Sequence, residues 1–166
     1  MSKDLWFYSI ALAVSKQSKC LSRQIGAILV RDDSVIAQGY NGPARGIPHC
    51  DTRHIIDPHL YNTNMVFSGV RCPRHDLGFN SGEGLHLCIA AHAERNCIAN
   101  AARNGVCTLN TAMYLTCEVP CKDCLSEIIN AGITELVVTS KDGYDSMGEF
   151  ILSHSDLVVR VYGDKL

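Results

Sequence analysis

Two short motifs bring together residue types that bind zinc and move protons. His92 and Glu94 are separated by one residue, and Cys121 and Cys124 follow Pro120 further along the chain. Cysteines at positions i and i+3 lie on one face of a helix, so both sulfurs can reach one ion. Two thiolates and one imidazole fill three tetrahedral positions around Zn²⁺ and leave the fourth open, as a catalytic site requires. We therefore expect His92, Cys121 and Cys124 to hold a catalytic zinc.

Glu94 is suited to proton transfer rather than to metal binding. Side chains at i and i+2 point about 200° apart on a regular helix, so His92 and Glu94 share a centre only if it lies off the helix's N-terminal end. A helix that begins near His92 meets this condition, and a carboxylate there can take a proton from a zinc-activated water and pass it on. Each motif has a plainer interpretation when it is considered alone. For His92 this is an ordinary surface or core histidine, and for the CxxC pair it is half of a zinc knuckle or a redox pair.

Regular elements surround the two motifs. Helices are expected over residues 5–16, 88–104, 120–131 and 145–153. Strands are expected over residues 25–30, 35–38, 111–116, 135–139 and 157–162. The first two strands form a hairpin, while the later strand–helix–strand alternation implies parallel pairing. The sequence therefore predicts an α/β protein with a mixed five-stranded sheet and helices on both faces, in one domain spanning residues 1–166.

The composition is that of a globular protein with an excess of cysteine. The 166 residues carry 15 basic and 17 acidic side chains, for a net charge of −2, and 46% are hydrophobic. This balance gives no sign of a nucleic-acid polymer as partner, and no apolar run is long enough to span a membrane. The nine cysteines, without a recognisable secretion signal, indicate metal or catalytic sites. We expect a reducing cytosol, of a bacterium or of a phage-infected host.

Three further segments accompany the two motifs: CLSRQIGA at residues 20–27, GYNG at residues 39–42 and SGEGLHLC at residues 81–88. With HAE at 92–94 and PCKDC at 120–124, the chain resembles the cytidine and deoxycytidylate deaminase superfamily over nearly its whole length, and within it the deoxycytidylate (dCMP) deaminases. The resemblance implies a three-layer α/β/α fold and hydrolytic deamination of dCMP to dUMP and ammonia, which supplies the dTTP pathway. It also assigns His92, Cys121 and Cys124 to the zinc and Glu94 to proton transfer.

The resemblance further indicates substrate contacts. The backbone N–H of Ala93 corresponds to the donor that holds the pyrimidine carbonyl, and Asn41 to the asparagine that contacts the sugar hydroxyl. Phosphate recognition needs local cations, for which Arg23, Arg45 and Arg103 are the candidates; each is otherwise an ordinary solvated residue.

An effector site is also implied. In dCMP deaminases a segment of this kind is associated with a nucleotide effector site, through which dCTP activates the enzyme and dTTP inhibits it. The corresponding residues here are Gly39, Tyr40, Asn41 and Gly42, and we add Arg45 to them. The plain alternative is a turn, because Asn-Gly is a common turn pair.

The family resemblance implies a homo-oligomer, often a hexamer. One segment departs from the family: residues 116–121 read TCEVPC, one residue longer than the corresponding run in many relatives.

Residues 42–86 form an irregular insertion, and a loop of this length needs something to hold it. Some relatives carry a second, structural zinc here. We expect a closed site of four cysteines, with His49 and His75 as substitutes for any member; the four are Cys20, Cys50, Cys72 and Cys88. Arg71 or Arg74 is expected to offset the charge of the thiolates. Cys97, Cys107 and Cys117 are expected to be packing residues.

Two alternatives remain open. Another nucleoside, nucleotide or tRNA adenosine deaminase of the same superfamily would use the same zinc chemistry, although the net charge of −2 argues mildly against tRNA. A non-catalytic zinc module would instead have closed tetrahedral sites.

Overall fold

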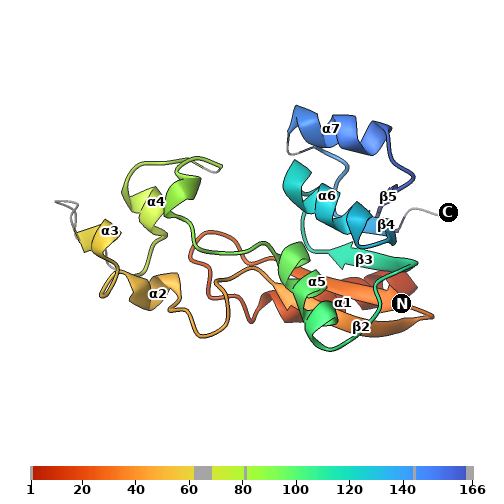
Figure 1. Cartoon of the computed structure of the whole chain (residues 1–166), viewed down its shortest axis with the longest axis horizontal. Helices are drawn as coiled ribbons and strands as arrows, with labels where there is room; N and C mark the ends of the chain where they lie inside the picture. The colour runs from red at the N-terminus through yellow and green to blue at the C-terminus, as the bar shows by residue number, and fades with distance from the viewer. Residues whose placement is uncertain (1, 62–68, 81, 144, 164–166) are drawn as a thin grey trace.

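A mixed five-stranded sheet lies at the centre of the protein (Figure 1). The structure, a computed structural model, describes residues 2–61, 69–80, 82–143 and 145–163. The strands are β1 (Gly26–Arg31), β2 (Ser34–Tyr40), β3 (Thr111–Leu115), β4 (Ile133–Val138) and β5 (Val158–Val161), in the spatial order β2-β1-β3-β4-β5. β1 pairs antiparallel with β2 and β3, whereas β3, β4 and β5 are parallel. The predicted mixed sheet with its opening hairpin is confirmed.

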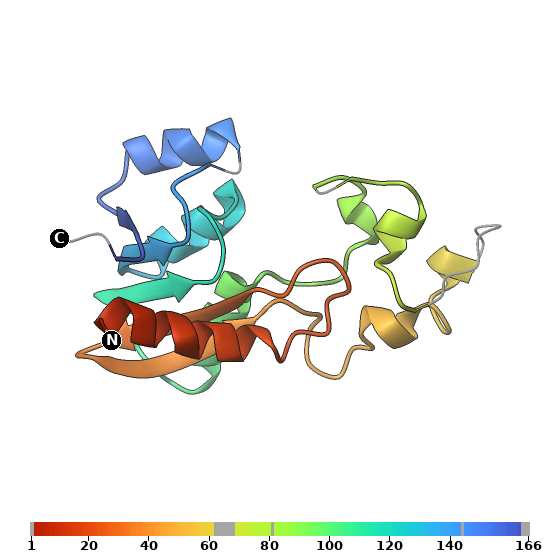
Figure 2. The ribbon, with the colours of Figure 1, turned by 180° about the vertical axis from the view of Figure 1, so that it is seen from behind.

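Helices cover both faces of this sheet, as predicted. The longer ones are α1 (Lys3–Ser15), α5 (Ala93–Arg103), α6 (Lys122–Asn130) and α7 (Ser146–Ser153). α1 lies on one face of the sheet (Figure 2). There it packs Phe7 and Ala11 against Ile28 and Val137. On the other face, α5 and α6 pack against the alternate side chains of the same strands, among them Leu29 and Leu136. Among the described helices, none is long and apolar enough to cross a membrane.

Helix α5 begins five residues later than the sequence predicted. Residues 88–91 are not helical because Ala91 forms a bridge with Gly42: the Gly42 N–H donates to the Ala91 carbonyl at 3.0 Å, and the Ala91 N–H donates back at 2.9 Å. His92 then caps the helix in an extended conformation. Its C-terminal end is as predicted, since Gly105 adopts a φ of +68° just after Asn104. The bridge fixes where the HAE motif enters the helix.

The insertion projects from one end of the sheet (Figures 1 and 2). It is less irregular than predicted, because it contains the short helices α2 (Cys50–Arg53), α3 (Pro58–Tyr61), α4 (Pro73–Asp76) and the 3-10 helix η1 (Leu85–Leu87). Two buried arginines hold it together. Arg53 is ion-paired with Asp57 and donates to the Leu87 carbonyl, and Arg74 donates to the Glu83 carbonyl. Hydrogen bonds to backbone carbonyls thus replace part of the apolar core that this segment lacks.

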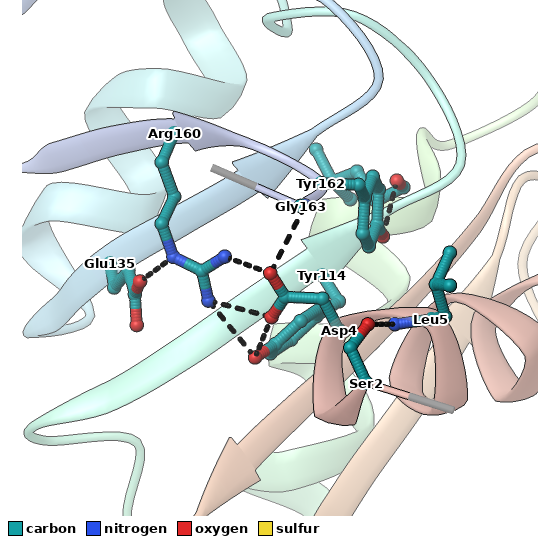
Figure 3. Close-up of polar contacts among 9 residues, drawn as sticks. Ser2, Asp4, Leu5, Tyr114, Glu135, Arg160, Tyr162 and Gly163 are labelled. Atoms are coloured by element: carbon teal, nitrogen blue, oxygen red, sulfur yellow. Dashed lines mark hydrogen bonds and ion pairs between the residues drawn. The ribbon is translucent and has the colours of Figure 1, made fainter. Parts of the chain in front are cut away.

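A polar network joins α1 to the far edge of the sheet (Figure 3). Arg160 of β5 donates to both carboxylate oxygens of Asp4, to Glu135 of β4 and to the Tyr114 hydroxyl. The Gly163 N–H also donates to Asp4, at 3.2 Å. This network links the first helix to the last strand.

Candidate active site

Three zinc-type ligands converge where two helices begin. His92 caps α5, Cys121 caps α6, and Cys124 lies in the first turn of α6. The His92 Nδ1 atom is 3.3 Å from the Cys124 sulfur and 3.6 Å from the Cys121 sulfur. In the described part of the chain, this is the one trio of histidine, cysteine or acidic residues whose ligand atoms all lie within 4.8 Å of one another.

This geometry fits zinc. Tetrahedral zinc with ordinary bond lengths places its nitrogen and sulfur ligands about 3.5 Å apart, and the two observed separations match that value. Hydrogen bonding within the trio also favours a thiolate. Cys124 and then His92 lower the pKa of Cys121 to about 4 against the effect of burial, while the bond with Cys121 raises the pKa of His92. The same pairing raises the pKa of Cys124.

Glu94 lies beside this trio, in the first turn of α5. Its side chain is only 3% exposed, and burial raises the pKa of its carboxyl group. Glu94, His92 and Cys121 line one pocket. A carboxyl group that is buried here and holds its proton more tightly than usual is suited to exchange protons with a molecule in that pocket.

The remaining walls of this pocket, which we term the catalytic pocket, come from three other parts of the chain. One wall contains Asn41 with Cys20, Ser22, Arg23 and Ile25. A second contains Arg74, Gly82 and Leu85 of the insertion with Cys88 and Ala90 just after it, and the third contains residues 117–120. The insertion therefore takes part in the site, which the sequence did not predict.

Asn41 holds one wall of the catalytic pocket in place. It is 7% exposed, its Oδ1 accepts from the Ile25 N–H at 2.8 Å, and its Nδ2 donates to the Arg23 carbonyl at 2.8 Å. Arg23 lines the same pocket and forms two parallel hydrogen bonds of 2.9 Å each with Glu118. Ala93, the first residue of α5, is fully buried. Arg23 and Asn41 are thus brought to the zinc-type trio.

The other candidate cations and most of the candidate effector residues lie outside the catalytic pocket. Gly39 packs so closely on α5 that an added Cβ would lie 2.3 Å from the Cys97 backbone nitrogen. Tyr40 ends β2 and Gly42 forms the bridge to residue 91. Arg45 donates to Asn100 of α5 at 2.7 Å, and Arg103 ends that helix. Of the GYNG segment, Asn41 lines the catalytic pocket.

The four cysteines expected to bind a second zinc line one smaller pocket, which we term the cysteine pocket. They are Cys20, Cys50, Cys72 and Cys88, and His49 lines it with them. Burial, followed by the nearby Cys72, raises the pKa of Cys50. The His49 Nδ1 is buried without a hydrogen-bond partner, whereas His75 lies 3.4 Å from the Ser22 hydroxyl. Within the described part of the chain, no three ligand atoms from these cysteines and histidines lie within 4.8 Å of one another.

The three remaining cysteines differ. Cys97 and Cys117 are buried in the core, as predicted, but Cys107 is exposed. The prediction for Cys107 is wrong because the chain has left α5 and has not yet entered β3 at this point. Cys117 and Glu118 also line the catalytic pocket. They belong to the run that is one residue longer than usual, which was the only signal for them in the sequence.

Fold and site together define the class of this protein. A histidine from one helix N-terminus, two cysteines from the next and an adjoining buried glutamate, on a mixed α/β sheet, are the arrangement of zinc-dependent deaminases. The chain belongs to the cytidine and deoxycytidylate deaminase family, because the model of the cytidine and deoxycytidylate deaminase zinc-binding region matches residues 1–140.

Two relatives and one solved structure illustrate the similarity. The chain is 31% identical to the deoxycytidylate deaminase of Saccharomyces cerevisiae over 161 residues, which cover 97% of this chain and 45% of that protein. It is 31% identical to the deoxycytidylate deaminase of Enterobacteria phage T2, covering 83% and 82%. The dCMP deaminase of cyanophage S-TIM5 in complex with dCMP and dUMP has the same fold, with a TM-score of 0.66, 21% identity and coverage of 97% and 98%. The chain spans less than half of the yeast relative.

Proposed function

We propose that this protein is a zinc-dependent hydrolase that converts dCMP to dUMP and ammonia and so supplies the dTTP pathway. The observation that carries the proposal is the convergence of His92, Cys121 and Cys124 beside the buried Glu94, at the wall of a pocket. The names of the yeast and phage relatives support dCMP as the substrate.

In this proposal the side chains take the roles that the family resemblance implies, and their positions support those roles. His92, Cys121 and Cys124 hold the zinc, which supplies Lewis-acid activation of water at neutral pH. Glu94 takes a proton from the attacking water and delivers it to ring atom N3, then passes the second proton to the departing amine. Burial of Glu94 supports this role, because a raised pKa lets the carboxyl group hold a proton between the two transfers.

The substrate contacts are part of the same proposal. Asn41 and the backbone N–H of Ala93 are assigned to the sugar hydroxyl and the pyrimidine carbonyl, and Arg23 to the phosphate. Their support is position: Asn41 and Arg23 line the catalytic pocket, and Ala93 lies between His92 and Glu94.

We also propose a structural zinc in the cysteine pocket. All four cysteines line this pocket, and the unpartnered Nδ1 of His49 is a further potential ligand. A bound ion would draw the sulfurs together and fix the insertion, residues 42–86, to the rest of a single domain, residues 1–166. The nine cysteines, all in the described part of the chain, form no disulfide, which supports a reducing, cytosolic compartment.

Regulation and assembly complete the proposal. dCTP as activator and dTTP as inhibitor are assigned to Gly39, Tyr40, Asn41, Gly42 and Arg45, and the contact of this segment with α5 would carry a binding signal to the zinc site. A homo-oligomer, a hexamer by family resemblance, is supported by the apolar outer face of α1. There Leu5, Trp6 and Leu12 are 52%, 45% and 39% exposed.

The test is an ultraviolet deamination assay of the zinc-loaded protein. We expect dCMP to be deaminated in preference to CMP, dCTP, deoxycytidine and adenosine, with dCTP raising and dTTP lowering the rate. Preferred deamination of deoxycytidine or of adenosine would assign a different deaminase activity. If none of the five compounds loses its amino group, the proposal is contradicted and a non-catalytic zinc module is favoured.

A further inference from the structure

We propose that Arg74, on helix α4 of the insertion, binds the 5′-phosphate of the nucleotide in the catalytic pocket. The inference rests on the proposed function and deepens it by adding a specificity-determining residue. It would explain why a pocket whose zinc-type ligands lie at the starts of α5 and α6 has a wall built from the insertion.

The first observation is that Arg74 is buried but incompletely bonded. It is 8% exposed and lines the catalytic pocket. One terminal nitrogen donates to the Glu83 carbonyl, while the Nε atom is buried with no hydrogen-bond partner. Guanidinium groups offer several N–H donors in one plane, and a buried donor without an acceptor is unfavourable. A ligand with several acceptor oxygens would satisfy these donors.

The second observation is the charge of the pocket. Among the described residues that line it, Arg23 and Arg74 are the two lysine or arginine side chains. Arg23 is already matched by Glu118 through two hydrogen bonds. Arg74 has no ion-pair partner within 4.0 Å in the described parts of the chain, unlike the other buried arginines, Arg53 and Arg160. Glu94, Glu118 and Cys121 also line the pocket, but no acidic side chain is paired with Arg74 in the described parts of the chain. A buried cation without a counter-ion is unfavourable, so Arg74 favours an anionic ligand.

Phosphate chemistry matches this unpaired guanidinium. The cytosine ring is neutral, and the group of dCMP that carries negative charge is its phosphate, which arginine binds through paired N–H···O contacts. The Ser22 hydroxyl lines the pocket with Arg74 and adds a second donor of the kind that phosphates accept. With the base at the zinc-type trio, the phosphate is the part of the substrate left to contact the insertion.

The charge of Arg74 has a competing use. Arg74 also lines the cysteine pocket, which shares Cys20, Ser22, Cys88 and Ala90 with the catalytic pocket. Its guanidinium would then neutralise thiolates rather than a ligand. The two uses predict different losses when the charge is removed, and one set of binding measurements separates them.

The experiment measures dUMP and deoxyuridine binding by calorimetry, with zinc content, for the zinc-loaded wild type and three variants. Arg74→Gln removes the charge, Arg74→Lys keeps it, and Arg71→Gln is the matched control, because Arg71 is 67% exposed and lines neither pocket. We expect Arg74→Gln to weaken dUMP binding about 10- to 100-fold, with deoxyuridine binding and zinc content unchanged. Arg74→Lys should lose less affinity for dUMP than Arg74→Gln, and Arg71→Gln should bind dUMP as tightly as the wild type.

Two results would overturn the inference. Equal weakening of dUMP and deoxyuridine would show a general disturbance of the pocket, and unchanged dUMP binding with lowered zinc content would assign Arg74 to the thiolates. If Arg74→Gln does not fold, the dUMP-to-deoxyuridine affinity ratio of Arg74→Lys decides: a lowered ratio supports the inference, and the wild-type ratio contradicts it. Turnover of dCMP by the wild type separately tests the proposed function.

Discussion

At the scale of single residues, the three zinc-type ligands lie close together where two helices begin. Each ligand comes from the first residues of a helix, where the backbone N–H groups and the helix dipole favour negative charge on Cys121. The hydrogen bonds among His92, Cys121 and Cys124 hold the three side chains within tetrahedral reach. Their separations match those of the nitrogen and sulfur ligands in a tetrahedral zinc site.

Cys124→Ala tests this arrangement. Cys124 is 1% exposed, and its removal should eliminate the zinc of this site and, with it, deamination of dCMP. Elemental analysis of the purified protein gives the zinc content per chain. Cys97→Ala is the control, because Cys97 is equally buried but packs in the core of the same helical layer. Retention of all zinc by Cys124→Ala would contradict the assignment.

The local part of the site was predictable, and the distant part was not. HAE and PCxxC each fix their own geometry through a helix start, and their combination matches the signature of zinc-dependent deaminases, so the trio and Glu94 were predictable. Whether Arg74, from the insertion, faces the catalytic pocket depends on tertiary packing, which no short pattern encodes. The same reason explains why Arg45 and Arg103, which are equally basic, lie elsewhere.

At the scale of elements, the close packing of β2 on α5 sets the position of the HAE motif. Gly39 allows this contact, and Asn96 and Asn100 of α5 donate to the carbonyls of Tyr40 and Gln38 on β2. The sequence signal for this contact was GYNG, for which the sequence left open a turn or an effector site. In the structure its first glycine serves helix packing.

Gly39→Ala should therefore destabilise the fold. The added Cβ would lie 2.3 Å from a backbone nitrogen of α5, which must shift, at a cost of about 1–3 kcal/mol in the free energy of unfolding. Gly42→Ala, in the same motif, should cost far less, since its nearest contact is 3.8 Å. Urea denaturation compares the two, and equal stability of both variants would exclude the packing role.

The Asp4–Arg160 network predicts a pH dependence of stability. Burial alone raises the pKa of Asp4, but hydrogen bonds from Arg160 and Gly163 outweigh it, so the pKa lies below its usual range (Figure 3). A carboxyl group with a lowered pKa in the folded state stabilises the fold above its unfolded pKa, and this contribution is lost as the pH falls through the folded value.

Asp4→Asn should accordingly lower the free energy of unfolding by about 1–2 kcal/mol at pH 7 and by much less in acid. Thermal unfolding from pH 7 down to pH 2 measures the difference from wild type. Asp33→Asn is the control, because its pair with Lys3 is exposed and contributes little. A constant difference across that range would show that the Asp4 charge does not stabilise the fold.

Most elements were predictable because strands and helices show their own periodicity and end signals. The start of α5 was not, because the bridge between Gly42 and Ala91 joins residues far apart in the sequence. The short helices of the insertion were missed for a similar reason. Each is only a few residues long, and buried contacts such as that of Arg53 with the Leu87 carbonyl hold them.

At the scale of the whole molecule, the insertion links the cysteine pocket to the catalytic pocket. Cys50→Ser should lower the zinc content from two ions per chain to one and should lower the melting temperature, because the remaining ligands cannot hold the insertion as firmly. Elemental analysis and thermal denaturation provide the two readouts. Two zinc ions in Cys50→Ser, or one in the wild type, would contradict the structural site.

Glu94 gives the most direct test of the whole account, because its proposed role joins zinc binding to deamination. The measurement is the rate of dCMP deamination by Glu94→Gln, compared with wild type at matched zinc content. We predict that the variant keeps its zinc and folds normally, while the rate falls by at least about 100-fold. A zinc-loaded variant that deaminates dCMP at the wild-type rate would contradict the account.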